Sequence, residues 1–438
     1  MSLKVERHTY HLKKMISIIS KKIIKPSSPT PSTQRWHNLS LIDQVVDNLY
    51  MPFVFFYSNH QVATIPKHQF SEFLTNSLSK TLTSYYPWAG SLKDNATIEC
   101  DDHGAEFFEV EINSSMNEVI HNPDLTFPKG LSWGYLSSST SGALIVVQLS
   151  HFECGGIALS LCMSHKVGDA CSAYFFLRDW ASLTRDPKLA LSPPYFVQDS
   201  LMPSIPFDVP LFSPVIEPKK ERCIQKRFVF SESKINALKA LVVAESCVQN
   251  PTRNEVVSAL LYKCATSSST TKSGRSQLVQ TSNLRSQTPL PPTSIGNIAT
   301  IFSTPIYENY EHDLKLPKLV TDIRKSKHDL STRNNLQENE YVKVMLEAYK
   351  TGKLPFHQRN CDIYTITSIL AFEFEKIDFG FGKPARASQE SGSFSNLFIL
   401  MNTPDDHDRG VEAFVNLNEQ HMSIFKNDKD LLQFATPF

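Results

Sequence analysis

Three features that would narrow the function of this 438-residue chain at once are missing from its sequence. The eight cysteines are scattered, and the absence of any C-x-x-C pair excludes a common zinc motif and favours reduced thiols in a cytoplasmic protein. Lys+Arg and Asp+Glu both total 44, so no excess of positive charge favours nucleic acid as a partner. No apolar run approaches the roughly 20 residues that a membrane span needs.

The first 25 residues are basic, with Glu6 as their one acidic residue. Organellar targeting segments are also basic and acid-poor, but they are usually rich in Arg and Ser, whereas the basic residues here are nearly all Lys. We therefore favour a frayed or strand-forming leader and keep organellar targeting as the minority alternative.

A proline-rich stretch divides the chain into two parts of similar length, with eight prolines between Pro187 and Pro218. Proline lacks a backbone donor and is excluded from helix interiors and central strands, so this stretch is predicted to be an extended crossover. The sequence thus predicts an N-terminal domain at 1–190, a linker at 191–222 and a C-terminal domain at 223–438.

Helical and strand patterns alternate on both sides of this crossover, which predicts an α/β (α+β) fold with two such layers. Apolar residues recur at helical spacing in four segments: 69–85, 169–184, 233–244 and 253–266, the last with Thr252 as its N-cap. Runs rich in aliphatic and β-branched residues predict strands at 143–149, 157–163, 227–230, 279–283, 299–303, 363–371 and 396–401.

The sharpest local feature is the segment Ser164-His165-Lys166-Val167-Gly168-Asp169, which lies between a predicted strand and a predicted helix. A neutral imidazole with a pKa near 6.5 is a competent general base at physiological pH. Among fourteen histidines, however, one with Asp four residues later is expected about once by chance, so an isolated match is more often structural.

A metal site near His151, Glu153 and Cys154 is a weaker alternative, because no compact second pair of ligands accompanies them. We therefore predict that no metal is bound.

Two further segments are weak by themselves. Asp378-Phe379-Gly380-Phe381-Gly382 predicts a buried aromatic anchor in a tight turn, and it reads as architecture more than catalysis. A kinase reading of Asp-Phe-Gly fails because no His-Arg-Asp loop or phosphate loop accompanies it. The second segment is Asn283-Leu284-Arg285, which is followed by Ile295-Gly296-Asn297. Taken alone, Arg285 would be an ordinary surface or loop arginine.

Taken together and in their order along the chain, the segments at 164–169, 283–297 and 378–382 resemble the plant BAHD acyltransferase family. The resemblance extends over nearly the whole chain. The supporting segments are Lys25-Pro26-Ser27-Ser28-Pro29, Tyr85-Tyr86-Pro87-Trp88-Ala89-Gly90 and Phe152-Glu153-Cys154-Gly155-Gly156. Within the family the chain looks most similar to the branch of the acylsugar acyltransferases, capsaicin synthase and vinorine synthase.

The resemblance implies two chloramphenicol-acetyltransferase-like domains joined by a long crossover loop, with an active-site channel at their interface. It implies that His165 is the general base and that Asp169 positions the loop and the histidine by pairing with Arg285. Asp378, Gly380 and Gly382 would be structural support. Acyl-CoA would be the co-substrate, with no permanently bound cofactor.

The chain departs from the family pattern at two positions. The family has a Thr-Ser-Trp segment near the reacting centre, where this chain has Thr367-Ser368-Ile369, and Phe381 likewise replaces a usual Trp. Thr367 remains a candidate contact to the oxyanion or the substrate. Neither Ile nor Phe can donate the hydrogen bond of an indole, so such a bond must come from elsewhere or be absent.

On this resemblance we predict an O-acyltransferase of plant specialised metabolism that acylates sucrose or an acylsucrose, and that acts as a monomer. The alternatives are an alkaloid O-acyltransferase, a capsaicin-synthase-like N-acyltransferase, and a catalytically silent relative that acts as a binding protein.

Overall fold

The structure is a computed structural model that describes residues 16–46, 48–63, 65–120, 142–198, 223–270, 273–308, 314–332, 342–344, 347, 361–389, 394–404 and 408–438. The chain forms two compact units. The first comprises Met1–Ser213, Thr293–Asn297 and Glu373–Glu390, and the second comprises Pro214–Pro292, Ile298–Phe372 and Ser391–Phe438.

A six-stranded mixed sheet is the centre of the first unit. Its strand order is β1 (Ile16–Ile24), β6 (Ala105–Ile112), β7 (Ile145–Phe152), β8 (Ile157–Ser164), β3 (Tyr50–Tyr57) and β16 (Arg386–Gln389). Only β6 and β7 run parallel, and the other neighbours are antiparallel. Strands β3, β7 and β8 are buried along their whole length, as expected for near-continuous apolar runs in the middle of a covered sheet.

The described residues of the first unit also form two smaller sheets and five α-helices. The sheets are β2 (Trp36–Asn38) with β5 (Thr97–Glu99) and β4 (Ser91–Leu92), and β9 (Tyr195–Phe196) with β12 (Ser294–Ile295). The helices are α2 (Leu41–Val45), α3 (Asn59–Val62), α4 (Lys67–Ser84), α5 (Met116–Val119) and α6 (Ala170–Arg185).

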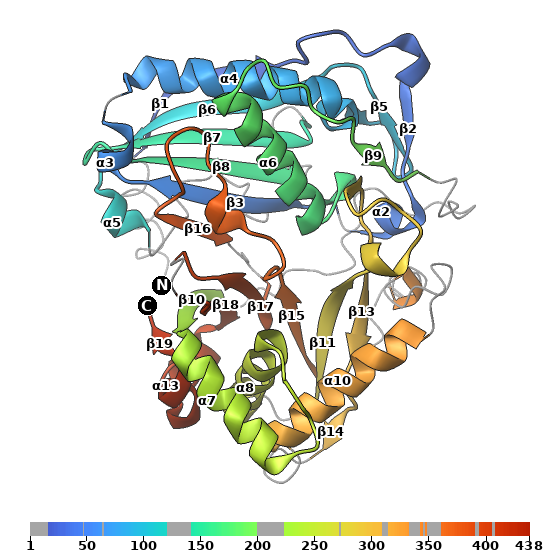
Figure 1. Ribbon diagram of the computed structural model, residues 1–438, viewed down its shortest axis with the longest axis vertical. Coiled ribbons are helices and arrows are strands. Elements are labelled where there is room, and N and C mark those ends of the chain that lie inside the picture. Colours follow the sequence, from blue (N-terminus) through green and yellow to red (C-terminus); the bar gives the residue numbers. More distant parts are fainter. Residues whose placement is uncertain are drawn as a thin grey trace, which may run out of the picture. The chain divides into compact units, whose positions relative to one another are not determined.

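Helices α4 and α6 pack against each other on one face of the six-stranded sheet (Figure 1). Trp180 of α6 is completely buried, and its indole N–H lies 3.2 Å from the Leu74 carbonyl and 3.0 Å from Ser77 Oγ of α4. The buried residues of α6 recur at helical spacing, so its apolar face fixes how the helix lies on the sheet.

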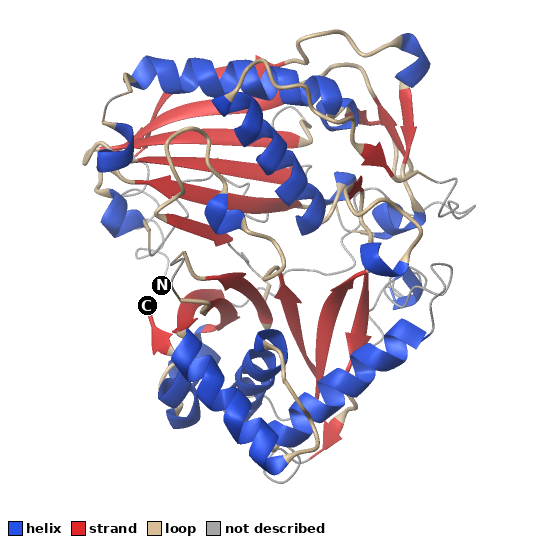
Figure 2. Cartoon of the chain, in the orientation of Figure 1, coloured by secondary structure: helices blue, strands red, loops and turns tan. Residues whose placement is uncertain are grey.

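An eight-stranded sheet is the centre of the second unit. The strand order is β13 (Ala299–Ser303), β11 (Arg275–Asn283), β15 (Asp362–Ser368), β17 (Leu397–Asn402), β18 (Val411–Asn418), β10 (Cys223–Phe230) and β19 (Thr436–Pro437), with β14 (Tyr307–Glu308) also pairing with β11. The α-helices in the described part of this unit are α7 (Glu232–Glu245), α8 (Arg253–Ser267), α10 (Leu316–Thr332), α12 (Glu419–Phe425) and α13 (Lys429–Phe434). Figure 2 shows α7, α8 and α10 as neighbouring helices beside these strands.

Helix α8 contributes eight buried residues to this unit's core, more than any other described helix. Its buried side chains lie all around the helix, as for a helix covered on every side. Thr252 is its N-cap, as predicted: Thr252 Oγ1 accepts a hydrogen bond from the Glu255 amide, and the Glu255 carboxylate accepts one from the Thr252 amide.

The predicted fold class, with an α/β layer in each half of the chain, is confirmed. All four predicted helices are present, and residues 16–24 form the edge strand β1, as the strand-forming reading of the leader expects. The strand predicted at 363–371 ends earlier, at Ser368, because the chain turns there and the Phe372 amide bonds back to the Ile369 carbonyl. Most of the proline-rich crossover lies outside the described residues.

The compact units are discontinuous in sequence, whereas the predicted boundaries at 1–190, 191–222 and 223–438 are continuous. Segments 293–297 and 373–390 come from the C-terminal part of the chain and belong to the first unit. Strand β16 explains the second of these, because its backbone pairs with β3 from Arg386 opposite Phe56 to Gln389 opposite Phe53.

Candidate active site

His165 lies where strand β8 ends and helix α6 has not yet begun. A short 3₁₀ helix, η5 (His165–Val167), leads from one element to the other. Its backbone is held on both sides: the His165 amide donates to the Leu49 carbonyl at 2.7 Å, and the His165 carbonyl accepts from Asn297 Nδ2 at 2.7 Å. The buried strand therefore delivers the imidazole to a fixed position.

His165 is partly buried as a residue. Nδ1 is fully buried and makes no hydrogen bond within the described part of the chain. Burial lowers the pKa of His165, while its own backbone carbonyl and the negative charge of Asp169 oppose this shift. The imidazole is therefore neutral at physiological pH, which is the form that can accept a proton.

Gly168 is required for packing. Its φ of 163° is extended backbone that any residue can adopt, so the backbone conformation is not what selects glycine. A Cβ at this position would lie 2.6 Å from Ser172 Cβ, which is closer than real contacts allow. Glycine thus lets the loop lie directly on the first turn of α6.

Asp169 is the N-cap of helix α6. Its Oδ1 accepts hydrogen bonds from the Ser172 amide at 2.9 Å and from the Ser172 hydroxyl at 3.1 Å. The same hydroxyl accepts a bond from the Gly296 amide at 3.0 Å, so it also joins segment 293–297 to this loop. A capping carboxylate satisfies amides that a helix start leaves unpaired.

Lys166, next to the histidine, is an almost completely buried cation. Its ammonium donates to the backbone carbonyls of Asp43 and Gln44 at 3.2 and 2.8 Å and to Asn95 Oδ1 at 2.7 Å. These three acceptors match the three N–H donors of an ammonium group, so hydrogen bonds within the protein replace those that water would make to the charge. The carbonyls belong to the end of α2, where such groups lack helical partners.

Asp43 and Asn297 form the second support of the loop, and sequence reasoning assigned neither of them a role. Asp43 Oδ1 accepts from the Asn297 backbone amide at 2.7 Å and from Asn297 Nδ2 at 2.8 Å. Asp43 Oδ2 accepts from the Ser40 hydroxyl at 2.6 Å and the Ser40 amide at 3.0 Å. The Ser-x-x-Asp spacing, typical of a capping box, was the one local signal for Asp43.

The segment around Asp378 is a tight turn with an aromatic anchor. Asp378 Oδ1 accepts from the amides of Gly380 and Gly382 at 2.7 and 2.9 Å, and both glycines have positive φ, +98° and +83°. The ring of Phe381 makes edge contacts with Tyr57 and Phe70 at centroid distances of 5.4 and 5.0 Å. The sequence predicted this turn and its aromatic anchor, and the role of Asp378, Gly380 and Gly382 as structural support stays a prediction.

The remaining predicted site residues belong to the second unit. Arg285 is buried in η6 (Arg285–Gln287), where its backbone amide bonds to Asn283 Oδ1 at 3.0 Å. Thr367 lies half-buried near the end of β15, opposite Ile399 of β17, and Ile369 is buried beyond it. The pairing of Asp169 with Arg285 and the role of Thr367 stay predictions.

His151, one member of the weaker metal hypothesis, bonds to a carboxylate: its Nε2 lies 2.9 Å from Glu109 Oε1. Within the described ranges, no three His, Cys, Asp or Glu side chains are grouped so that they could hold a metal ion. In the same ranges, no helix is long and apolar enough to cross a membrane.

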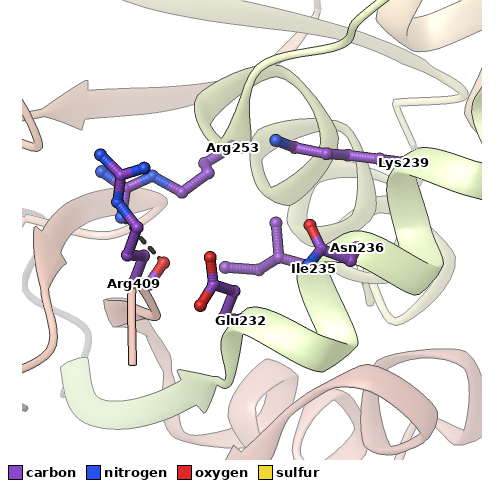
Figure 3. Close-up of a pocket in the computed structure, with 6 residues that line it drawn as sticks. All are labelled: Glu232, Ile235, Asn236, Lys239, Arg253 and Arg409. Carbon is purple, nitrogen blue, oxygen red and sulfur yellow. Dashed lines mark hydrogen bonds between the residues drawn. The ribbon is translucent and has the colours of Figure 1, made fainter. Parts of the chain in front are cut away.

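A pocket of about 270 Å³ lies within the second unit and has a charged lining (Figure 3). Its walls are formed by Glu232, Ile235, Asn236, Lys239, Arg253 and Arg409. The Arg253 guanidinium is already committed to structure, because it donates to the backbone carbonyls of Arg409 and Gly410 and to Asn402 Oδ1. The pocket contains none of the predicted site residues.

The chain is similar to one family along nearly its whole length. The model of the Transferase family matches residues 14–432. Acyltransferase Pun1 of Capsicum frutescens is 42% identical, with 96% of this chain and 98% of that protein covered. Acylsugar acyltransferase 3 of Solanum lycopersicum is 35% identical, covering 96% of this chain and 98% of that protein. The crystal structure of vinorine synthase matches with a TM-score of 0.80 at 29% identity, covering 96% and 98% of the two chains.

These matches and the two sheet-centred units define the class of protein. The chain belongs to the plant BAHD acyltransferase family and has its chloramphenicol-acetyltransferase-like fold. As a member of that family it is an acyltransferase with acyl-CoA as co-substrate.

Proposed function

We propose that this protein is an O-acyltransferase of plant specialised metabolism in which His165 is the general base. The observation that carries this is a histidine held at the end of a buried strand by hydrogen bonds to both of its backbone groups. Because Nδ1 is fully buried, Nε2 is the nitrogen that accepts the proton.

The reaction follows from this base. His165 Nε2 takes the proton of an acceptor hydroxyl as the oxygen attacks the thioester carbonyl, and a tetrahedral oxyanion forms. Its collapse breaks the carbon–sulfur bond, and the proton on the imidazole neutralises the departing CoA thiolate. Thr367 is our candidate contact to the oxyanion or the substrate, and one such donor is typically worth about 3 kcal/mol.

For the acceptor we propose sucrose or an acylsucrose. The likeness to acylsugar acyltransferase 3 supports this choice. The same base could serve an alkaloid hydroxyl or an amine, so the acceptor depends on residues that bind it and not on the proton transfer. We expect the enzyme to act as a monomer in the cytoplasm.

Release of free CoA tests the proposal. Purified protein is incubated with several short acyl-CoAs and with sucrose, an acylsucrose, an alkaloid alcohol or an aromatic amine, and products are identified by mass. We expect transfer to the sugar hydroxyl, and a loss of about 10²–10⁴-fold in kcat for His165→Ala, as for removal of a general base. Transfer to amines alone would replace the O-acyl proposal, and undiminished transfer by His165→Ala would refute the role of His165.

A further inference from the structure

We propose that Asn297 is a positioning residue for His165, and that Asp43 fixes the direction in which the Asn297 amide points. This inference rests on the proposed function, because it matters for catalysis only if His165 is the base. It assigns a task to two buried side chains that the sequence motifs left without one.

The Asn297 side chain connects Asp43 to the proposed base. Nδ2 lies 2.8 Å from Asp43 Oδ1 and 2.7 Å from the His165 carbonyl oxygen, so the two N–H groups of one amide serve two acceptors. Asn297 is 2% exposed, and water therefore has little access to either bond.

The carboxylate of Asp43 decides which end of this amide faces His165. An ionised carboxylate only accepts hydrogen bonds, so it selects the NH₂ end of Asn297. The second N–H then points at the His165 carbonyl. With the amide turned over, its oxygen would face both the carboxylate and that carbonyl, and two acceptor pairs would repel each other.

Asp43 can stay ionised in spite of its burial. Burial raises the pKa of Asp43 above its usual value, and the hydrogen bonds from Ser40 and Asn297 offset only part of this rise. Four donor contacts of 2.6–3.0 Å surround its two oxygens. Charge-assisted bonds of this kind are stronger than neutral ones, so the anion is well stabilised.

The result for His165 is a backbone held from two directions. Its amide is bonded to Leu49 and its carbonyl to Asn297, while the neighbouring Lys166 is bonded to the end of α2. The position of the imidazole depends on these bonds, and a displacement of about 1 Å at a reacting group can cost on the order of 10²-fold in rate.

The first test compares two buried asparagines. Asn297→Ala is expected to lower kcat by about 10–100-fold while KM for acyl-CoA stays within about threefold, because the loss is one of alignment and not of binding. Asn416→Ala is the matched control: Asn416 is also buried, and its amide donates to the Phe394 carbonyl in the second unit. It should lower thermal stability to a similar extent and leave kcat near wild type.

The pH profile supplies a readout that a purely structural role would not change. Asn297 raises the pKa of His165, as does Asp169, whereas burial and the charge of Lys166 lower it. A general base works when deprotonated, so activity rises with pH through its pKa. Without Asn297 the pKa falls further, and the acid limb of kcat/KM moves to lower pH.

A double-mutant cycle tests whether Asp43 acts through Asn297. Asp43→Asn is nearly isosteric but no longer forces the orientation of the Asn297 amide, so kcat should fall by a smaller factor than in Asn297→Ala. The double variant should be no slower than Asn297→Ala alone, since coupled residues are not additive. Fully additive losses would refute the role assigned to Asp43.

His165→Ala, assayed in parallel, distinguishes a failure of the positioning role from a failure of the proposed function. If His165→Ala is inactive and folded Asn297→Ala has wild-type kcat and pH profile, the positioning role is wrong and the proposed function stands. If His165→Ala retains full activity, the proposed function fails and the positioning role fails with it.

Discussion

Asp169 caps helix α6 through Ser172, whose amide and hydroxyl both lie within hydrogen-bonding distance of the same carboxylate oxygen. The second residue of the His-x-x-x-Asp pattern is thus fixed to the helix that follows the loop. Its charge also raises the pKa of His165 against the effect of burial. The two effects can be separated, because asparagine caps a helix as well as aspartate does.

Asp169→Asn should therefore preserve folding and change catalysis. We expect its free energy of unfolding to fall by less than that of Asp169→Ala, which also loses the cap at a cost of about 0.5–2 kcal/mol. Both variants should move the acid limb of kcat/KM to lower pH, since both remove the charge that favours protonated His165. Chemical denaturation and pH–rate profiles check this, and an acid limb moving to higher pH would contradict it.

Lys166→Met is expected to destabilise the first unit. The substitution keeps an apolar stem but removes the ammonium, which leaves Asn95 Oδ1 without that buried donor. A buried polar group left unsatisfied costs about 1–3 kcal/mol. The control is Lys80→Met: exposed Lys80 also donates to a backbone carbonyl, that of Pro187, and its loss should stay within about 0.5 kcal/mol. Equal unfolding free energies for both variants would contradict the prediction.

The turn at Asp378 should tolerate asparagine better than alanine. Asp378→Asn keeps an oxygen that can accept from the amides of Gly380 and Gly382, whereas Asp378→Ala loses both bonds at a cost of about 1–3 kcal/mol. Gly382→Ala should cost about 1–2 kcal/mol, because its φ of +83° is strained for any residue with a Cβ. Thermal denaturation ranks the three, and a turn indifferent to all of them would show that the hydrogen bonds contribute nothing.

His421 should make the second unit sensitive to acid. It is buried, its Nε2 lies 2.6 Å from the Ala265 carbonyl, and burial lowers its pKa from the usual value of about 6.5. The unfolded chain therefore binds a proton before the folded one does, and stability should decline as the pH falls below about 6.5.

The variant His421→Gln keeps a donor for Ala265 and cannot titrate. Its Tm should change less than that of wild type between pH 7 and pH 5, as followed by scanning calorimetry. Parallel Tm profiles for the two proteins would show that another group causes the acid sensitivity.

Local patterns were enough to predict the loop that carries His165. A continuous apolar run predicts β8, and apolar residues at helical spacing predict α6. The polar segment between these two elements must therefore be the loop that connects them. The turn formed by Asp378 and its two glycines could also be predicted, because a turn of this kind depends only on residues that are close together in the sequence.

The partners of that loop could not be read in the same way. Asp43 and Asn297 are 254 residues apart, and a contact of such length leaves no periodicity in either segment. Strand β16 was missed for a related reason: Arg386–Gln389 has no apolar alternation and becomes a strand only because β3 offers it an edge.

This late strand has a consequence for synthesis of the protein. The edge of β3 at Phe53–Phe56 stays uncovered until residue 389 has left the ribosome, so the first sheet cannot be finished when its own half of the chain is complete. An uncovered apolar edge invites pairing with other chains. A gene fragment that ends near residue 222 should therefore yield insoluble protein, and adding residues 373–390 from a second gene fragment should raise its solubility.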